Sequence, residues 1–315
     1  MSEQYWQWSA RRLADSIAKR EVTIGDVTAN LVEHLRRYNP SVNAVVDDLT
    51  ELALEDAQAK DQWLREHQAT GPLFGVPMTI KENVDQVGRA TPNGVEALKD
   101  VIAPADSPVV SNLLAAGALV LGRTNTPEFS FRAFTSNPLH GPTLNPWDPE
   151  KTPGGSSGGA AVATLMGFGP LAHGNDIGGS LRIPAFCCGL STVKPSAGRV
   201  PAFLPSASVE RPFLASQMSA QGVIARAVDD VRLALESLVA SDPRDPWHIP
   251  LPLTGETLEK PLKVAVTRET YGLPISAPIE KALESAAQML ADAGYQVEEV
   301  ETPSVMAVSY THLTL

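Results

Sequence analysis

Apolar residues in the first 70 positions recur at the spacing of a helix. Those that follow one another at four-residue intervals are Leu13 and Ile17, then Val27, Leu31 and Leu35. Such a repeat places apolar side chains on one helical face, so it predicts two helices between residues 10 and 38 that end at Asn39-Pro40. A short strand over 42–46 and an alanine-rich helix over 51–67 are expected next. Residues 1–70 are therefore predicted to form a helical segment that packs on the core.

From residue 75 the pattern changes to short apolar runs that are separated by glycine and proline and alternate with helical stretches. The expected strands cover 77–80, 118–121 and 169–173, and the expected helices cover 107–116, 157–166 and 227–239. After a loop over 241–259, a further strand (262–267), helix (278–293) and strand (296–300) are expected. This alternation is typical of α/β proteins. The predicted fold is α/β, with a central mixed β-sheet covered by helices on both faces.

Composition and charge exclude several classes of partner. The chain is 43% hydrophobic and 19% charged, as a folded globular protein is. Its 36 acidic and 25 basic residues give a net charge of -11, which repels a phosphate backbone or an anionic membrane surface. The longest apolar run, over 160–172, falls short of the roughly 20 residues of a membrane helix. We expect neither nucleic acid nor a membrane as a partner.

The first residues and the cysteines bear on the compartment. Residues 1–4 lack the basic start and apolar stretch of an export signal. Cys187 and Cys188 are adjacent, and a disulfide between neighbours distorts the intervening peptide. We therefore expect a cytoplasmic protein with two free, buried thiols.

Two turns of small residues are candidates for chemistry. The run Gly-Gly-Ser-Ser-Gly-Gly over 154–159 leads directly into an apolar helix, which a flexible linker seldom does. The run Asp-Ile-Gly-Gly-Ser over 176–180 follows a strand, and consecutive amides in such a turn can converge on an anion. The hydroxyl of Ser180 is placed to attack a carbonyl whose developing oxyanion those amides hold. Taken alone, this second turn equally fits a plain strand-to-helix connection.

A hydroxyl nucleophile needs a base, and the histidines do not supply an obvious one. His140, His173 and His248 have no acidic residue at motif spacing. Lys81 instead ends an apolar strand, where burial can lower a lysine pKa from about 10.4 by about three. Read by itself, Lys81 also fits a side chain that extends from the strand end to water.

These segments together resemble the amidase signature family. They are Gly75-Val76-Pro77 with Lys81, the run over 154–159, and the run over 176–185. The resemblance extends to segments 122–129, 145–146, 186–189, 193–196 and 198–201, and covers about residues 5–303. It implies the amidase signature fold and hydrolysis of a small-molecule carboxylic acid amide, with no metal or organic cofactor. A homodimer stays open.

The resemblance also implies roles for individual residues. The family's Ser-Ser-Lys triad falls on Lys81, Ser156 and Ser180. Ser180 would attack the amide carbonyl, while Ser156, on a cis peptide, would bridge Ser180 to the neutral amine of Lys81 and pass a proton to the leaving nitrogen. The oxyanion hole falls on the backbone amides of Ile177, Gly178, Gly179 and Ser180. Asp176 and Arg182 correspond to a structural pair that braces this turn.

The sequence departs from the family pattern in two respects. Asn175 stands where the family more often has Ser or Thr, which is expected to affect support of the turn more than catalysis. Family members are also considerably longer, so we expect a C-terminally truncated core over 71–303, with an incomplete sheet and a doubtful tail over 304–315.

Two other functions remain open. Gly-Ser-Ser-Gly-Gly over 155–159 fits Gly-x-Ser-x-Gly, which would make Ser157 the nucleophile of an α/β-hydrolase-type esterase, although only His248 is then available as its histidine. The second alternative is the glutaminase-type subunit of a tRNA-dependent amidotransferase. Against it, Ile183 precedes Pro184 where that subunit has Gln, and Pro127 precedes Glu128 where it has Asp.

Overall fold

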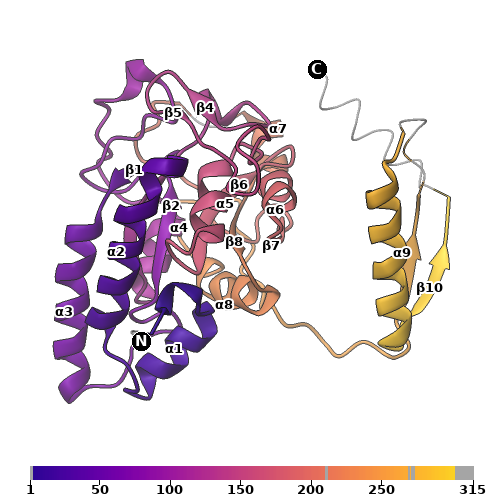
Figure 1. The fold of residues 1–315 in the computed structure, drawn as a ribbon, viewed down its shortest axis with the longest axis horizontal. Helices are drawn as coiled ribbons and strands as arrows, with labels where there is room; N and C mark the ends of the chain where they lie inside the picture. The colour runs from indigo at the N-terminus through magenta and orange to yellow at the C-terminus, as the bar shows by residue number, and fades with distance from the viewer. Residues whose placement is uncertain (1–2, 210–211, 269, 271–273, 302–315) are drawn as a thin grey trace. The chain divides into compact units, whose positions relative to one another are not determined.

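The computed structural model describes residues 3–209, 212–268, 270 and 274–301, and Figure 1 shows it as a ribbon. The chain divides into two compact units, residues 1–251 and residues 252–315, which are described separately. The domain limits expected at residues 70 and 303 stay predictions. The expected tail lies outside the described residues.

The N-terminal helices begin at side-chain caps. Ser9 accepts a hydrogen bond from the backbone of Arg12 at the start of α1 (Ala10–Ala18), and Thr23 accepts one from Asp26 at the start of α2 (Ile24–Val42). Such caps satisfy amides that have no partner inside the helix. A third helix, α3 (Thr50–Glu66), follows. Helices α1 and α2 agree with the apolar spacing in the sequence, and α3 agrees with the alanine-rich helix expected over 51–67.

The expected end of α2 at Asn39-Pro40 is wrong, because the helix continues to Val42 with Pro40 inside it. Pro40 lies in the last turn, where its missing N–H removes a single helical hydrogen bond. The helix ends instead at Asn43, which adopts the left-handed conformation with φ 52°. The Asn39 side chain then accepts hydrogen bonds from the amides of Ala44 and Val45, which shifts the expected strand from 42–46 to 45–48.

A six-stranded sheet forms the centre of the first unit, in the order β1-β3-β2-β6-β8-β7. Its strands are β1 (Val45–Asp48), β2 (Pro77–Lys81), β3 (Leu119–Thr124), β6 (Leu171–Asp176), β7 (Ser191–Thr192) and β8 (Ala220–Ala225). Strands β3, β2 and β6 run parallel, while β1, β8 and β7 pair antiparallel with their neighbours. The sheet is therefore mixed, as predicted.

Strand β8 was not predicted, although it pairs with β6 along six residues. Gln221 and Gly222 interrupt its apolar run. Every residue of β8 is buried, and a strand buried on both faces lacks the alternating pattern that marks half-buried strands. The short helices α6 (Arg182–Cys188) and α7 (Phe213–Met218) also lie in stretches for which no helix bounds were predicted.

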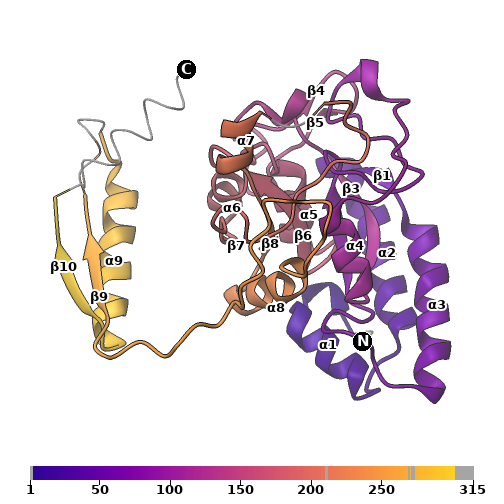
Figure 2. The ribbon, with the colours of Figure 1, turned by 180° about the vertical axis from the view of Figure 1, so that it is seen from behind.

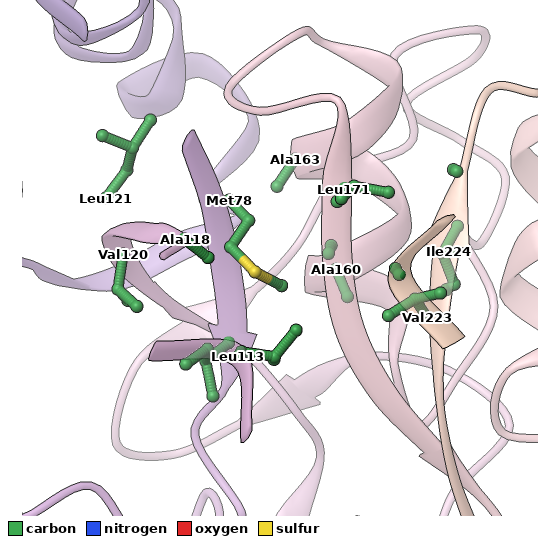
Figure 3. Close-up of a cluster of buried hydrophobic side chains, with 14 of the residues drawn as sticks. Met78, Leu113, Ala118, Val120, Leu121, Ala160, Ala163, Leu171, Val223 and Ile224 are labelled. Carbon is green, nitrogen blue, oxygen red and sulfur yellow. The ribbon is translucent and has the colours of Figure 1, made fainter. Parts of the chain in front are cut away.

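Both faces of the sheet are covered. Strands β2, β3 and β8 are buried at every position, and successive side chains of a strand point to opposite faces. The covering helices include α4 (Pro108–Ala115), α5 (Gly158–Leu165) and α8 (Val228–Leu238); Figure 2 shows α4 and α8 beside each other. Figure 3 shows how Ala160 and Ala163 of α5 bring this helix close to Leu171 and Met78.

The second unit is a β-α-β arrangement. Strand β9 (Lys263–Val266) pairs in parallel with β10 (Gln296–Glu299), and α9 (Ala277–Asp292) connects them. These elements agree with the predicted strand, helix and strand. The remaining elements are η1 (Tyr5–Gln7), η2 (Glu96–Leu98), η3 (Glu128–Ser130), β4 (Ser136–Asn137) and β5 (Gly141–Pro142). Across the described ranges, no helix has the length and apolar character needed to cross a bilayer.

Candidate active site

The parallel strands β2 and β6 bring the polar ends of both strands to one edge of the sheet. Met78 pairs with Leu171 and Thr79 with Ala172, so Lys81, which ends β2, lies beside the last residues of β6. Ligand and catalytic groups of parallel sheets gather at such carboxyl edges. In this chain the register places Lys81 next to Asn175.

The run of small residues over 154–159 carries two serines to the same edge, directly before α5. A Cβ atom on Gly155 would lie 2.6 Å from the backbone nitrogen and oxygen of Phe134, so only glycine allows this close approach. The peptide bond between Gly155 and Ser156 is cis. The next residue, Ser157, donates its backbone N–H to the carbonyl of Ser180 at 3.2 Å, which joins the two turns.

The amine of Lys81 has three oxygen partners. Its Nζ lies 2.7 Å from Ser156 Oγ, 3.1 Å from Ser157 Oγ and 2.9 Å from Asn175 Oδ1. Lys81 is 0% exposed, and Ser156 and Ser157 are 1% and 0% exposed. The amine and both serines are therefore shielded from bulk water.

Burial lowers the pKa of Lys81 from its ordinary value of 10.5 to about 7, although the negative charges of Asp176 and Glu82 act in the opposite direction. Removing a cation from water disfavours its charged form, which explains the sign. At this pKa a large fraction of the amines is neutral near pH 7. A neutral amine in contact with a hydroxyl can accept its proton.

The turn after β6 is held by the carboxylate of Asp176. Its Oδ1 accepts from the backbone of Gly179 at 2.8 Å, and its Oδ2 accepts from the backbone of Leu181 at 3.2 Å. Arg182 adds two charge-assisted bonds, from Nε and Nη2, of 2.9 Å each. Burial opposes ionisation of Asp176, but the hydrogen bonds from Arg182, Gly179 and Leu181 outweigh it and lower its pKa.

These contacts decide which amides of the turn are available. Within the described part of the chain, the N–H groups of Ile177, Gly178 and Ser180 have no hydrogen-bond acceptor. The N–H of Gly179 is already donated to Asp176. Three amides of one turn therefore remain free to bind an anion.

A cavity of about 260 Å³ connects these groups. Ser156, Ser180 and Asn175 line it together with Ile177. Its apolar wall is formed by Val84, Val109, Phe129, Phe131, Phe203 and Leu204. Among the described residues the Ser180 hydroxyl makes no hydrogen bond, so it is free to meet a molecule in the cavity.

The residues proposed from sequence thus meet at one place. Lys81 contacts Ser156 directly, and Ser180 lines the same cavity as Ser156. The contact between Lys81 and Asn175 was missed, because Asn175 was expected to affect support of the turn more than catalysis. No short stretch of sequence signals this contact, because it depends on the parallel register of β2 and β6, which places the ends of both strands together.

The histidines take other roles in the structure. His140 Nε2 lies 2.9 Å from Glu82 Oε2, and His173 Nε2 lies 3.0 Å from Gln221 Oε1. The Ser157 hydroxyl contacts Lys81 and the carbonyl of Asn175. Residues 3–209, 212–268, 270 and 274–301 contain no group of three His, Cys, Asp or Glu side chains arranged to hold a metal ion.

An α/β fold with a buried lysine, two serines and free amides at one sheet edge is an arrangement suited to acyl transfer. The model of the family named Amidase matches residues 26–313. The chain belongs to the amidase family.

Individual relatives agree with this assignment. The chain is 53% identical over 306 residues to an indoleacetamide hydrolase of Bradyrhizobium diazoefficiens, which covers 97% of the chain and 58% of that relative. It is 32% identical over 305 residues to a glutamyl-tRNA(Gln) amidotransferase subunit from Sulfurihydrogenibium sp., covering 95% of the chain and 62% of that relative. The chain therefore spans about three fifths of the length of these relatives.

A solved structure gives the same fold. A fatty acid amide hydrolase superposes with a TM-score of 0.85 at 26% identity, over 96% of the chain and 54% of that protein. The amidase signature fold predicted from the sequence is confirmed.

Proposed function

We propose that this protein hydrolyses a carboxylic acid amide to the acid and ammonia or an amine, through an acyl-enzyme on Ser180. The observation that carries the proposal is the 2.7 Å contact between the buried amine of Lys81 and the hydroxyl of Ser156, on a cavity that Ser180 also lines. A hydroxyl becomes a nucleophile when a nearby base removes its proton. The pKa of Lys81, lowered to about 7 by burial, makes it such a base.

In the proposed reaction the proton moves through Ser156. As the Ser180 oxygen attacks the substrate carbonyl, its proton passes to Ser156 Oγ and the Ser156 proton passes to Lys81 Nζ. The C–N bond then breaks, and the proton returns through Ser156 to the leaving nitrogen. Water attacks the resulting ester by the same route, so that the amide and one water yield the acid and ammonia or an amine.

The turn over 176–180 stabilises the negative charge that develops on the carbonyl oxygen. The free amides of Ile177, Gly178 and Ser180 are the donors that the proposal uses. The sequence also suggested Gly179, whose N–H is engaged by Asp176 in this structure. Asp176 and Arg182 hold the turn in place before a substrate arrives.

An amide with an aryl or alkyl acyl group is the substrate class that we propose. Phe129, Phe131 and Phe203 line the cavity, and aromatic walls favour flat apolar groups. The carboxylate of Asp176 is paired with Arg182, so the cavity wall offers no unpaired charge at that point. The relative from Bradyrhizobium diazoefficiens, whose name specifies indoleacetamide, supports an aryl acyl group. The cytoplasmic location and the homodimer stay predictions.

Two observations disfavour the alternatives. Ser157 is 0% exposed and contacts the Lys81 amine rather than a histidine, which does not match an esterase elbow. Identity to the amidotransferase subunit is 32%, against 53% for the indoleacetamide hydrolase. We therefore favour an amidase that acts without partner chains.

The test is a panel of aryl and alkyl amides assayed for ammonia with the full chain alone, with the acyl-enzyme detected by mass spectrometry. We expect an acyl adduct on Ser180 that Ser180→Ala abolishes, whereas Ser157→Ala retains the adduct. An adduct on Ser157, or ammonia release from glutamine only after partner chains are added, would contradict the proposal.

A further inference from the structure

The side-chain amides of Asn83 and Asn175 bind each other reciprocally. Asn83 Nδ2 donates to Asn175 Oδ1 at 3.1 Å, and Asn175 Nδ2 donates to Asn83 Oδ1 at 2.9 Å. Two hydrogen bonds between the same two groups restrain the orientation of each amide relative to the other. Asn175 is therefore oriented by a residue two positions beyond Lys81.

The contacts of Ser130 determine the positions of the oxygen and the nitrogen in the side-chain amides of Asn83 and Asn175. Ser130 donates its hydroxyl to Asn93 Oδ1 at 2.7 Å. Its oxygen therefore accepts from Asn83, whose Nδ2 lies 2.9 Å away. Because Asn83 Nδ2 is the atom that faces Ser130 and Asn175, the atom of Asn175 that meets it must be the oxygen Oδ1. This same oxygen lies 2.9 Å from Lys81 Nζ.

The three oxygen partners of Lys81 Nζ differ in whether they accept an N–H of the neutral amine or face its lone pair. A neutral amine has two N–H groups and one lone pair. The amide oxygen of Asn175 can only accept, and Ser157 donates its hydroxyl to the Asn175 carbonyl at 3.4 Å, so its oxygen also accepts from the amine. Both N–H groups are thereby used. The lone pair is left for Ser156, at 2.7 Å.

We propose that Asn175 is a positioning residue: its side-chain oxygen, oriented by Asn83, takes one N–H of the neutral Lys81 amine so that the lone pair faces the Ser156 hydroxyl. This inference rests on the proposed function, in which that lone pair receives the proton of Ser156. It assigns to Asn175 a part in the reaction itself, beyond support of the turn.

The variants Asn175→Ala and Asn175→Asp act on the amine in opposite directions. Alanine removes an acceptor that stabilises the ammonium, so the pKa of Lys81 falls. Aspartate puts a negative charge beside the amine, so the pKa of Lys81 rises. Asn112→Ala is the matched control, because the Asn112 amide binds the carbonyls of Leu238 and Ala240 and does not line the cavity.

The first measurement does not depend on activity. The full chain is labelled with 13C at the lysine ε-carbon and titrated by NMR, and the Lys81 signal is assigned by its loss in Lys81→Met. We expect the Lys81 midpoint to rise by about one pH unit or more in Asn175→Asp, to fall in Asn175→Ala, and to stay unchanged in Asn112→Ala. Midpoints that match the wild type in both Asn175 variants overturn the inference.

The second measurement separates positioning from a structural role. Asn175→Ala should lower kcat about 10-fold for an amide substrate, because the lone pair no longer has a fixed direction, and it should leave KM within about twofold. An unchanged kcat, or a loss that lies in KM alone, overturns the inference. If Asn175→Ala does not fold, the similarly shaped Asn175→Asp carries the test through its titration and its kcat.

The outcomes distinguish this inference from the function on which it rests. The proposed function is overturned, and the contact supported, if the wild-type chain forms no acyl-enzyme while the Lys81 midpoints of Asn175→Asp and Asn175→Ala shift as expected. A chain that forms the adduct on Ser180 while kcat and both midpoints are insensitive to Asn175 overturns the inference and supports the function.

Discussion

The backbone N–H of Ser157 donates a hydrogen bond of 3.2 Å to the carbonyl oxygen of Ser180. These residues lie in turns that precede α5 and α6, and the bond holds the two turns against each other. The residue before Ser157 contacts Lys81, and Ser180 lines the cavity. One backbone hydrogen bond thus links the turn that carries Ser156, the partner of Lys81, to the proposed nucleophile Ser180.

Activity should depend on pH with a midpoint close to 7. Only the neutral amine of Lys81 accepts a proton, and burial lowers its pKa to about 7. The kcat/KM for an amide should therefore rise as pH increases through 7 and then level off. A profile that is flat from pH 5.5 to 9 would contradict the role of Lys81.

Replacing Lys81 should remove activity and change the pH dependence of stability. Because the native pKa lies below the ordinary 10.5, the native state binds fewer protons than the unfolded state between pH 7 and 10.5. Lys81 therefore destabilises the fold fully below pH 7, by about 5 kcal/mol, and the effect disappears as pH approaches 10.5.

Chemical unfolding of Lys81→Met and wild type at pH 6 and pH 10.5 measures this difference. The free energy of unfolding of the variant minus that of the wild type should be about 5 kcal/mol larger at pH 6 than at pH 10.5. Lys60→Met, at a partly buried lysine paired with Asp56, should show no comparable change. A variant without this pH dependence would mean that the amine stays charged in the fold.

His173 should make the protein sensitive to acid. Burial, assisted by the charge of Lys81, lowers its pKa from 6.5 to about 4 against the hydrogen bond to Gln221. The unfolded state binds the proton first as pH falls, so stability is lost from pH 6.5 down to about 4, by about 3 kcal/mol. In denaturant titrations, His173→Gln should lose about 3 kcal/mol less unfolding free energy than the wild type between pH 6.5 and 4. The control His67→Gln, at an exposed histidine, should lose as much as the wild type.

Arg182 should affect rate more than binding. Its two bonds of 2.9 Å hold Asp176, whose carboxylate holds the turn. Arg182→Ala should lower kcat about 10- to 100-fold, because small displacements of catalytic donors have effects of that size. Arg232→Ala, which breaks an exposed pair with Glu236, is the control. Equal kcat values in steady-state assays of Arg182→Ala and wild type would exclude a bracing role.

Phe131 should contribute to the choice of substrate. It is 79% exposed and lines the cavity, so an aryl acyl group can cover it. Phe131→Ala should raise KM for an aryl amide about 10-fold, through about 1.4 kcal/mol of lost contact, and change KM for acetamide little. Phe186→Ala, at a similarly exposed phenylalanine that does not line the cavity, should leave both unchanged. A parallel change for both amides would place Phe131 outside the acyl site.

The sequence by itself determined most of the architecture and indicated the residues of the candidate site. The four-residue spacing of apolar positions predicted α1 and α2, the alanine-rich stretch predicted α3, and the short apolar runs predicted β2, β3 and β6, because all these patterns are local. The order of the small-residue turns indicated the amidase family, which the comparison with its model confirms.

Only the tertiary structure decided which partners meet. Strand β8 stayed hidden because Gln221 and Gly222 interrupt its apolar run, so that neither alternation nor a continuous apolar run marks it. Helix α2 passed the expected stop at Pro40 because the cost falls on a single bond in the last turn. The contact of Lys81 with Asn175 joins residues 94 positions apart. It depends on the register of two parallel strands, and no short stretch of sequence specifies that register.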